Sequence, residues 1–161
     1  MLSSLQPLLY VQISPEQLCA RNAKTGQSVC EPAEIAMTTQ AKPVIRAIGS
    51  AARLAVAELG VTLIKPFAHP RSLVSDFIAG EQLLKEVIRR LYGKSIFAFA
   101  PMIILHLMGD PEGGFTPVEI RAFREMALAS GATQVTLWQG RSLTDDEIRS
   151  RQFPAGGKIL L

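Results

Sequence analysis

The sequence predicts an α/β fold in which a mixed β-sheet is flanked by helices. Short apolar segments follow one another in the first third of the chain, and after that they alternate with segments of helical periodicity. Hydrophobic residues make up 48% and charged residues 19% of the 161 residues. This composition suffices for one sizeable core and argues against disorder.

The strands are predicted from apolar and β-branched segments that are bounded by glycine, proline and polar turn residues. We expect them over residues 8–13, 18–22, 28–30, 34–38, 44–48, 61–64, 102–107, 134–138 and 158–161. The segment 102–107 is the clearest, because an uninterrupted apolar run is typical of a strand that is buried on both faces.

Helices are predicted between the later strands. Ser50 is expected to cap a helix over residues 50–59. An apolar face over residues 83–91 predicts a second helix, which Gly93 closes.

Two further helices are predicted from their first residues. Thr116 and Glu119 have the spacing of a capping box with Pro117 at the first helical position, and Gly131 is expected to end this helix. Thr144 opens a short helix with the same spacing.

Charge and cysteine content exclude several classes of protein. The net charge is +3 and no run of Lys and Arg occurs, so we expect no nucleic-acid partner. We interpret Cys19 and Cys30 as small buried residues rather than a disulfide framework. Their spacing from His69 and His106 matches no zinc site, so no metal is expected.

The chain start lacks the basic region and cleavage site of a secretory signal. The longest apolar run, residues 95–108, is too short to span a bilayer, and a cytoplasmic protein is expected. Leu2, Leu5, Leu8 and Leu9 could form a short amphipathic foot, which without basic residues gives at most weak membrane association.

Six short segments between Gln12 and Gln139 resemble motifs of the MreB family, the bacterial actin-like proteins that determine rod shape, in the same order and at nearly constant spacing. They are Glu31-Pro-Ala-Glu-Ile-Ala36, Ala47-Ile-Gly49, Ile64-Lys-Pro66, Ser75-Asp-Phe77, Val118-Glu-Ile-Arg-Ala122 and Gly131-Ala-Thr-Gln-Val135.

The resemblance implies a ribonuclease H-like fold, that of the first domain of an actin-like ATPase. It also implies that residues 1–161 form a single actin-like domain and that the family's second domain is absent.

The residues that bind ATP in the family are replaced in this chain. The segment 12–18 falls where the family has its first phosphate loop, an Asp-Leu-Gly-Thr type of turn. Gln12 stands where an aspartate would hold metal-bound water, and Ser14 and Pro15 stand in the phosphate turn. Gln12 carries no charge for magnesium, and Pro15 removes an amide donor.

The family's Glu-Glu-Pro motif after the fifth strand corresponds to residues 139–141, which read Gln-Gly-Arg. The second phosphate loop and the adenosine-binding segments have no counterpart in the sequence. We therefore expect no nucleotide or other cofactor.

Glu119 is the one candidate catalytic residue. The resemblance implies a role near the attacking water in ATP hydrolysis, whereas the capping box explains the same glutamate by helix stability alone. A nucleophile–base pair of Cys19 with His69 or His106 is also conceivable, although the sequence does not bring these residues together.

We expect a non-catalytic actin-like protein, an interaction or cytoskeleton-associated module linked to cell shape and not an enzyme. Its partner is expected to be another protein or a second copy, bound at the face left by the missing second domain. One alternative is an ATP-binding or ATP-hydrolysing protein with a non-standard site. Another is a small-molecule or peptide-binding module that re-uses the old cleft.

Overall fold

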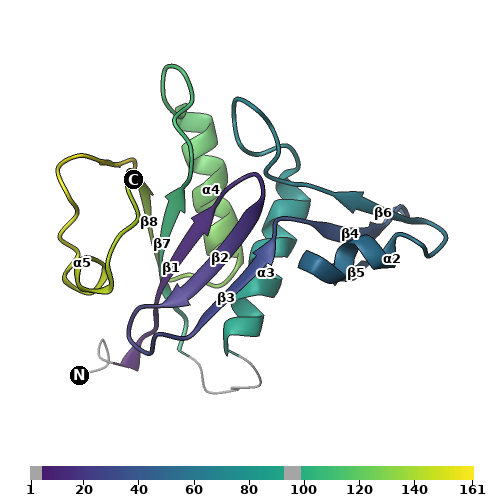
Figure 1. Ribbon diagram of the computed structural model, residues 1–161, viewed down its shortest axis with the longest axis horizontal. Coiled ribbons are helices and arrows are strands. Elements are labelled where there is room, and N and C mark those ends of the chain that lie inside the picture. The colour runs from purple at the N-terminus through teal and green to yellow at the C-terminus, as the bar shows by residue number, and fades with distance from the viewer. Residues whose placement is uncertain (1–4, 93–98) are drawn as a thin grey trace.

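The computed structural model describes residues 5–92 and 99–161, and Gly93 lies outside them. A six-stranded sheet has the order β3-β2-β1-β7-β8-β9, and a three-stranded sheet has the order β5-β4-β6 (Figure 1). The strands are β1 (Leu8–Ile13), β2 (Gln17–Asn22), β3 (Ser28–Pro32), β4 (Ile35–Thr38), β5 (Ile45–Ile48), β6 (Val61–Ile64), β7 (Met102–Leu107), β8 (Gln134–Gln139) and β9 (Lys158–Ile159). The helices are η1 (Gly49–Ala51), α2 (Ala52–Ala55), α3 (Phe77–Tyr92), α4 (Pro117–Ala129) and α5 (Asp145–Ser150).

The centre of the large sheet is parallel and its margins are antiparallel. β1 pairs in parallel with β7, and β7 pairs in parallel with β8. β2, β3 and β9 join by antiparallel pairing. Helices cover the sheet (Figure 1), so the predicted mixed sheet flanked by helices is confirmed.

The main core lies between the large sheet and helices α3 and α4. Alternate residues of β1, including Leu9 and Val11, enter this core together with Leu105 of β7. The intervening residues, such as Tyr10, face a smaller cluster that contains Trp138 and Ile148 of α5. Both faces of the central strands are therefore buried, which explains their nearly continuous apolar sequence.

Helices α4 and α5 begin as their sequences predict. The Thr116 and Thr144 side chains each accept a hydrogen bond from the backbone N–H three residues later, and both capping boxes are complete. Gly131, with a φ of 100°, follows α4 and adopts the left-handed conformation that closes a helix.

An ion pair with a buried carboxylate and an exposed arginine lies at the start of β4. The Glu34 carboxylate, 6% exposed, accepts hydrogen bonds from Arg53 Nε at 2.8 Å and Nη2 at 2.7 Å. Lys65 Nζ lies 3.7 Å from the same carboxylate. The Arg53 hydrogen bonds lower the pKa of Glu34 despite its burial, so this carboxylate stays ionised and joins α2 to β4.

The helix expected over residues 50–59 is much shorter in the structure. Only η1 and the single turn of α2 form, and the Ser50 side chain caps neither. Leu54 and Leu59 are 80% and 101% exposed, so the segment has too little apolar contact to extend the helix. The final strand is likewise shorter than expected, covering Lys158–Ile159.

The amphipathic foot that Leu2, Leu5, Leu8 and Leu9 could have formed is not seen among the residues that the structure describes. Leu8 and Leu9 lie in β1 and are 3% and 0% exposed, whereas Leu5 is exposed. Leu2 lies outside the described residues. Within 5–92 and 99–161, no helix combines the length and apolar character needed to cross a bilayer.

The interpretation of Cys19 and Cys30 as small buried residues is also wrong. They lie directly opposite each other on β2 and β3 and form a disulfide, with Cys30 exposed and Cys19 half-buried. In β2 the core positions are Leu18 and Ala20, and the alternation of a strand turns the intervening Cys19 to the other face.

Gly49, the first residue of η1, provides a test of the packing of η1 against Glu31 of β3. It has a φ of 62°, and a Cβ atom there would overlap the Glu31 carboxylate, which also accepts the Ser50 N–H. We expect Gly49→Ala to destabilise the fold by roughly 2–4 kcal/mol, through backbone strain and steric overlap. Urea unfolding measures this loss.

Gly60 is the matched control, because its φ is 78° and nothing lies within 4 Å of an added Cβ. Gly60→Ala should cost only about 1 kcal/mol, from backbone strain alone. Equal losses for the two variants would contradict the close packing of Gly49 on Glu31.

Candidate functional site

The candidate site is the edge of the large sheet where the carboxyl ends of β1, β7 and β8 meet. We define this carboxyl edge as the segments 14–16, 108–116 and 140–143, together with the neighbouring loop 65–76. The parallel pairing of the three strands brings these segments together. Ligands of open α/β sheets bind at such an edge, so its chemistry decides what the fold can do.

The turn after β1 uses its polar groups internally. The Ser14 N–H donates to the Gln17 carbonyl at 3.0 Å, and the Gln17 N–H donates to Ser14 Oγ at 3.0 Å. Pro15 has no N–H to offer. The turn therefore presents few of the amide donors that a phosphate cradle needs.

Gln12 lies at the centre of a row of side chains across the sheet. Its register partners are Cys19 on β2 and His106 on β7. Its Nε2 donates to Ser142 Oγ at 2.9 Å, so the side chain binds the segment after β8. An uncharged amide held in this way is a poor substitute for a magnesium-binding carboxylate.

A buried hydrogen-bond network lies beside Gln12. Tyr10 Oη and His106 Nδ1 are 2.6 Å apart, and His106 Nε2 lies 2.8 Å from the Gly140 carbonyl. The carbonyl can only accept, so Nε2 carries the proton and Nδ1 accepts from the Tyr10 hydroxyl. The Leu143 N–H in turn donates to Tyr10 Oη at 3.1 Å.

This network holds the segment after β8 against the sheet. His106 is 1% exposed, and burial lowers its pKa, which keeps the imidazole neutral. Burial also disfavours the charged form of Tyr10 and therefore raises the pKa of its hydroxyl. Both groups are saturated by hydrogen bonds, so their arrangement is structural.

Glu119 is engaged on both carboxylate oxygens. Oε2 accepts the Thr116 N–H at 2.5 Å, which completes the capping box of α4. Oε1 accepts from Arg71 Nη1 at 3.1 Å, and Arg71 Nη2 also donates to the Gly114 carbonyl at 3.2 Å. The loop 65–76 is thereby bound to the start of α4.

The electrostatics of Glu119 suit an ion pair. Partial burial would raise the pKa of this carboxyl, but the Thr116 hydrogen bonds and the Arg71 charge outweigh it and lower the pKa. A carboxylate held in this way is a weak proton acceptor, whereas a general base works best with a pKa near the working pH.

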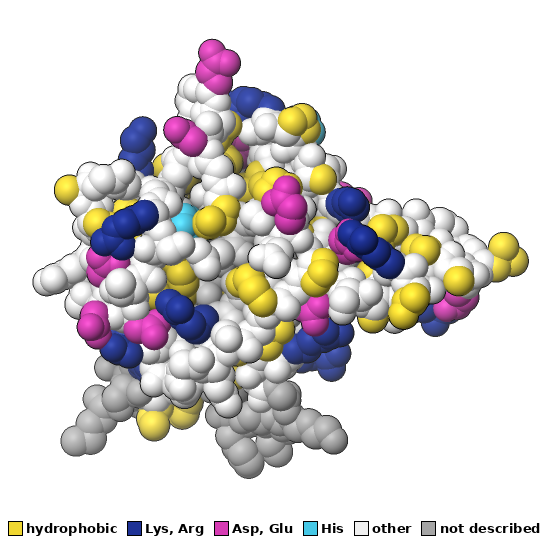
Figure 2. Space-filling model, in the orientation of Figure 1, with side chains coloured by type: hydrophobic (Ala, Val, Ile, Leu, Met, Phe, Trp, Pro, Cys, Tyr) yellow, Lys and Arg dark blue, Asp and Glu magenta, His cyan; other side chains and the backbone are white. Residues whose placement is uncertain are grey.

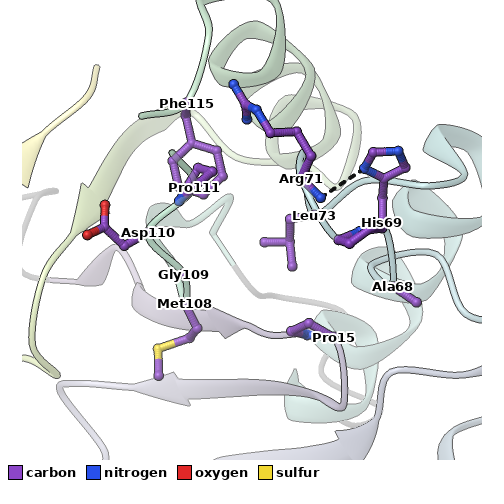
Figure 3. Close-up of a pocket in the computed structure, with 11 residues that line it drawn as sticks. Pro15, Ala68, His69, Arg71, Leu73, Met108, Gly109, Asp110, Pro111 and Phe115 are labelled. Atoms are coloured by element: carbon purple, nitrogen blue, oxygen red, sulfur yellow. Dashed lines mark hydrogen bonds between the residues drawn. The ribbon is translucent and has the colours of Figure 1, made fainter. Parts of the chain in front are cut away.

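A pocket of about 190 Å³ opens between the loop 65–76 and the segment 108–116. Figure 3 shows Leu73 and Phe115 beside it, with the Asp110 carboxylate pointing away from His69. His69 Nδ1 accepts the N–H groups of Arg71 and Ser72, at 3.2 and 3.0 Å, which shapes the loop. The pocket is smaller than the roughly 300–1,000 Å³ of typical ligand sites.

The end of β8 and the segment that follows it are bound to neighbouring segments. Gln139 Nε2 donates to the Gly109 carbonyl at 2.9 Å and approaches Asp110 Oδ1 at 3.3 Å. Arg141 forms a salt bridge with Glu147 at the start of α5. These contacts hold the segments in place, and an open hollow of about 460 Å³ remains between Gly109, Gln139 and Lys158.

Neither a metal site nor a nucleophile–base pair forms among residues 5–92 and 99–161. No group of three or more His, Cys, Asp or Glu side chains there could hold a metal ion. Gln12 lies between Cys19 and His106 in the register, which separates them by two strand spacings, about 9–10 Å. Cys19 is bonded to Cys30, and His69 Nδ1 accepts the N–H groups of Arg71 and Ser72, so neither conceivable pair with Cys19 forms.

Comparison with known proteins assigns the family. The sequence model described as "MreB/Mbl protein" matches residues 18–143. The chain belongs to the MreB/Mbl family. No curated protein sequence matches this MreB/Mbl chain significantly.

Solved structures support the same fold. The chain is similar to MreB5 of Spiroplasma citri bound to AMPPNP, with a TM-score of 0.63 and 21% identity, over 82% of this chain and 38% of that one. It is also similar to MreB5 of Spiroplasma citri bound to ADP, with a TM-score of 0.62 and 20% identity, over 82% and 37%. The chain thus spans less than two fifths of those proteins and has an actin-like, ribonuclease H-like fold.

The sequence pointed to Gln12, Pro15 and Glu119, but not to the residues that form the hydrogen bonds around them. Arg71 lies 48 residues before Glu119, and no sequence pattern links the two. Tyr10 and His106 come together only through the parallel register of β1 and β7. A polar residue within the apolar run of β7 was the one available signal.

We predict that Glu119→Gln lowers stability by roughly 0.5–1 kcal/mol, the scale of one capping interaction, and leaves any phosphate release from ATP unchanged. Thermal unfolding and a phosphate-release assay measure the two effects. Glu147→Gln is the matched control, because Glu147 completes the same capping box on α5 and also pairs with an arginine. Loss of phosphate release in the Glu119 variant alone would show a catalytic role.

We predict that stability falls as the pH falls below the unfolded-state histidine pKa of about 6.5. The folded-state pKa of His106 is depressed, so the unfolded chain binds more protons in this window and protonation favours unfolding. Urea unfolding between about pH 8 and pH 5.5 measures the slope. His106→Gln should flatten it, and an unchanged slope in this variant would contradict the assignment.

Proposed function

We propose that this chain is a non-catalytic, cytoskeleton-associated interaction module linked to cell shape, and that it acts in the cytoplasm through a single actin-like domain. Family membership supports a cytoskeletal role, and the chemistry of the carboxyl edge supports the absence of catalysis. The partner is another protein or a second copy of the chain.

The observation that carries the proposal is the ion pair between Arg71 and Glu119, together with the changed sequence of the turn after β1, which corresponds to the family's first phosphate loop. Both oxygens of the one candidate catalytic carboxylate, that of Glu119, already accept hydrogen bonds, one from Arg71 and one from the Thr116 N–H. Gln12 and Pro15 supply neither the negative charge for a magnesium ion nor a backbone donor for phosphate. A carboxylate with no bound phosphate or metal has nothing to act on.

The carboxyl edge and the adjoining first turn of α4 also offer apolar surface to a protein partner. Val118, at the start of α4, is 78% exposed, and Met108, directly after β7, is 38% exposed. Basic and acidic side chains are interspersed over the face drawn in Figure 2, without a continuous basic stripe. This distribution suits a mixed protein interface better than a nucleic acid.

An ATP-dependent function with a non-standard site has no specific support in the geometry. Two hollows open at the edge. One of about 190 Å³ is lined by Arg71 and Asp110, and one of about 460 Å³ is lined by Asp110 and Lys158, so that opposite charges in each do not favour a polyphosphate. The nucleotides in the two MreB5 structures belong to those proteins.

We expect the purified chain to self-associate or to capture a cytoskeletal protein through the carboxyl edge. Sedimentation velocity over a range of concentrations measures the self-association. Val118→Asp should weaken it at least tenfold, because a charge at a buried apolar contact costs more than about 1.4 kcal/mol.

Leu59→Asp is the control, since Leu59 is fully exposed at the far end of the small sheet and its replacement should leave association unchanged. An effect of the Leu59 variant alone would place the interface on the small sheet instead. A chain that stays monomeric at high concentration and captures no cytoskeletal or envelope protein would contradict the proposed function.

A further inference from the structure

Cys19 and Cys30 form a disulfide outside the hydrogen-bond network and the Arg71–Glu119 pair. They face each other across the antiparallel strands β2 and β3, midway along a ladder of five residue pairs. The hairpin also has backbone support of its own, since the Asn22 N–H donates to the Gln27 carbonyl at 2.8 Å and the Gly26 N–H donates to the Asn22 carbonyl at 2.8 Å. The strands therefore hold the two cysteines together whether or not the sulfur atoms are bonded.

The disulfide is accessible from solvent. Cys30 is exposed on β3, which is the edge strand of the six-stranded sheet, and Cys19 is half-buried. Cys19 also lines a small surface hollow of about 90 Å³ with Gln12, Ser14 and Met108. Disulfides that are exposed exchange with thiols more readily than those enclosed in a core.

We propose that Cys19–Cys30 is a reversibly reducible disulfide that exchanges with thiols from outside the chain, with Cys30 as the sulfur that is attacked. An incoming thiolate forms a bond to Cys30 Sγ, the Cys19–Cys30 bond breaks, and its electron pair leaves on Cys19 as a thiolate. A second thiol then attacks the mixed disulfide and releases Cys30 as a thiolate. The net reaction oxidises two external thiols to their disulfide and reduces the protein disulfide to two thiols.

The position of the bridge connects this chemistry with the carboxyl edge. Cys19 is the register partner of Gln12, and it shares the surface hollow with Ser14 of the turn after β1. Opening the bridge replaces a cross-strand covalent link with two free thiols beside that turn. In a cytoplasm, where glutathione keeps thiols reduced, an exposed bridge of this kind serves redox sensing more readily than permanent stabilisation.

The test uses the full chain without denaturant. After oxidation with oxidised glutathione, the protein is treated with reduced glutathione, quenched with iodoacetamide at intervals, and weighed by intact-mass spectrometry. We expect a doubly alkylated species to form at a rate within about tenfold of the rate in guanidinium, where access is complete. A native rate on the order of a thousandfold lower would overturn the proposal, as would two free thiols after the oxidising step.

Single-cysteine variants test which sulfur is attacked. Cys19→Ser leaves the exposed Cys30, which should form a mixed disulfide with oxidised glutathione faster than the half-buried Cys19 of Cys30→Ser. The reverse order would contradict attack at Cys30. A parallel arm with thioredoxin and its reductase distinguishes a dithiol protein from glutathione as the faster reductant. The wild-type kinetics need neither the variants nor the proposed partner, so this test stands if the proposed function fails.

Discussion

The parallel pairing of β1 with β7 and of β7 with β8 is the constraint on which the rest of the structure depends. Each of these strands buries side chains on both faces, against α3 and α4 on one side and against the cluster around Trp138 on the other. Burial of one large apolar side chain contributes roughly 1.5–3 kcal/mol, so the central strands alone supply a large share of the hydrophobic stabilisation. Nothing in this ladder requires a ligand, and the fold can persist while its edge changes.

The same pairing determines the chemistry of the carboxyl edge. Polar groups that lie close together at the ends of parallel strands must bind a ligand, water or one another. In this chain they bind one another: Gln12 contacts Ser142, Tyr10 contacts His106, and Arg71 contacts Glu119. These contacts fix the loops and leave few free donors for a phosphate, which supports the proposal that this actin-like fold is non-catalytic.

Local patterns were enough for most of the fold. The apolar run of β7 and the capping boxes at Thr116 and Thr144 depend on neighbouring residues, and the structure confirms them. The helix expected over residues 50–59 does not form in full, because its apolar side chains have no core to pack against. The full exposure of Leu59 shows this.

The site was harder to predict because its partners are distant in sequence. Glu119 could be identified as a candidate, but its contact with Arg71 depends on the placement of a loop that no periodicity describes. The Cys19–Cys30 bridge depends on which face of β2 each residue occupies, and a shift of one residue in register would have buried the cysteine. Contacts of this kind follow from the fold and not from local pattern.

The central claim is that the actin-like sheet stays packed although the residues that would bind phosphate have been replaced. Amide chemical shifts of the isotope-labelled chain, followed during titration with magnesium-ATP, test this claim most directly because they report on each turn of the carboxyl edge separately. The account predicts a dispersed, folded spectrum in which the amides of Ser14 and of residues 108–116 do not shift in a saturable way up to millimolar nucleotide. Saturable shifts confined to those amides would contradict it.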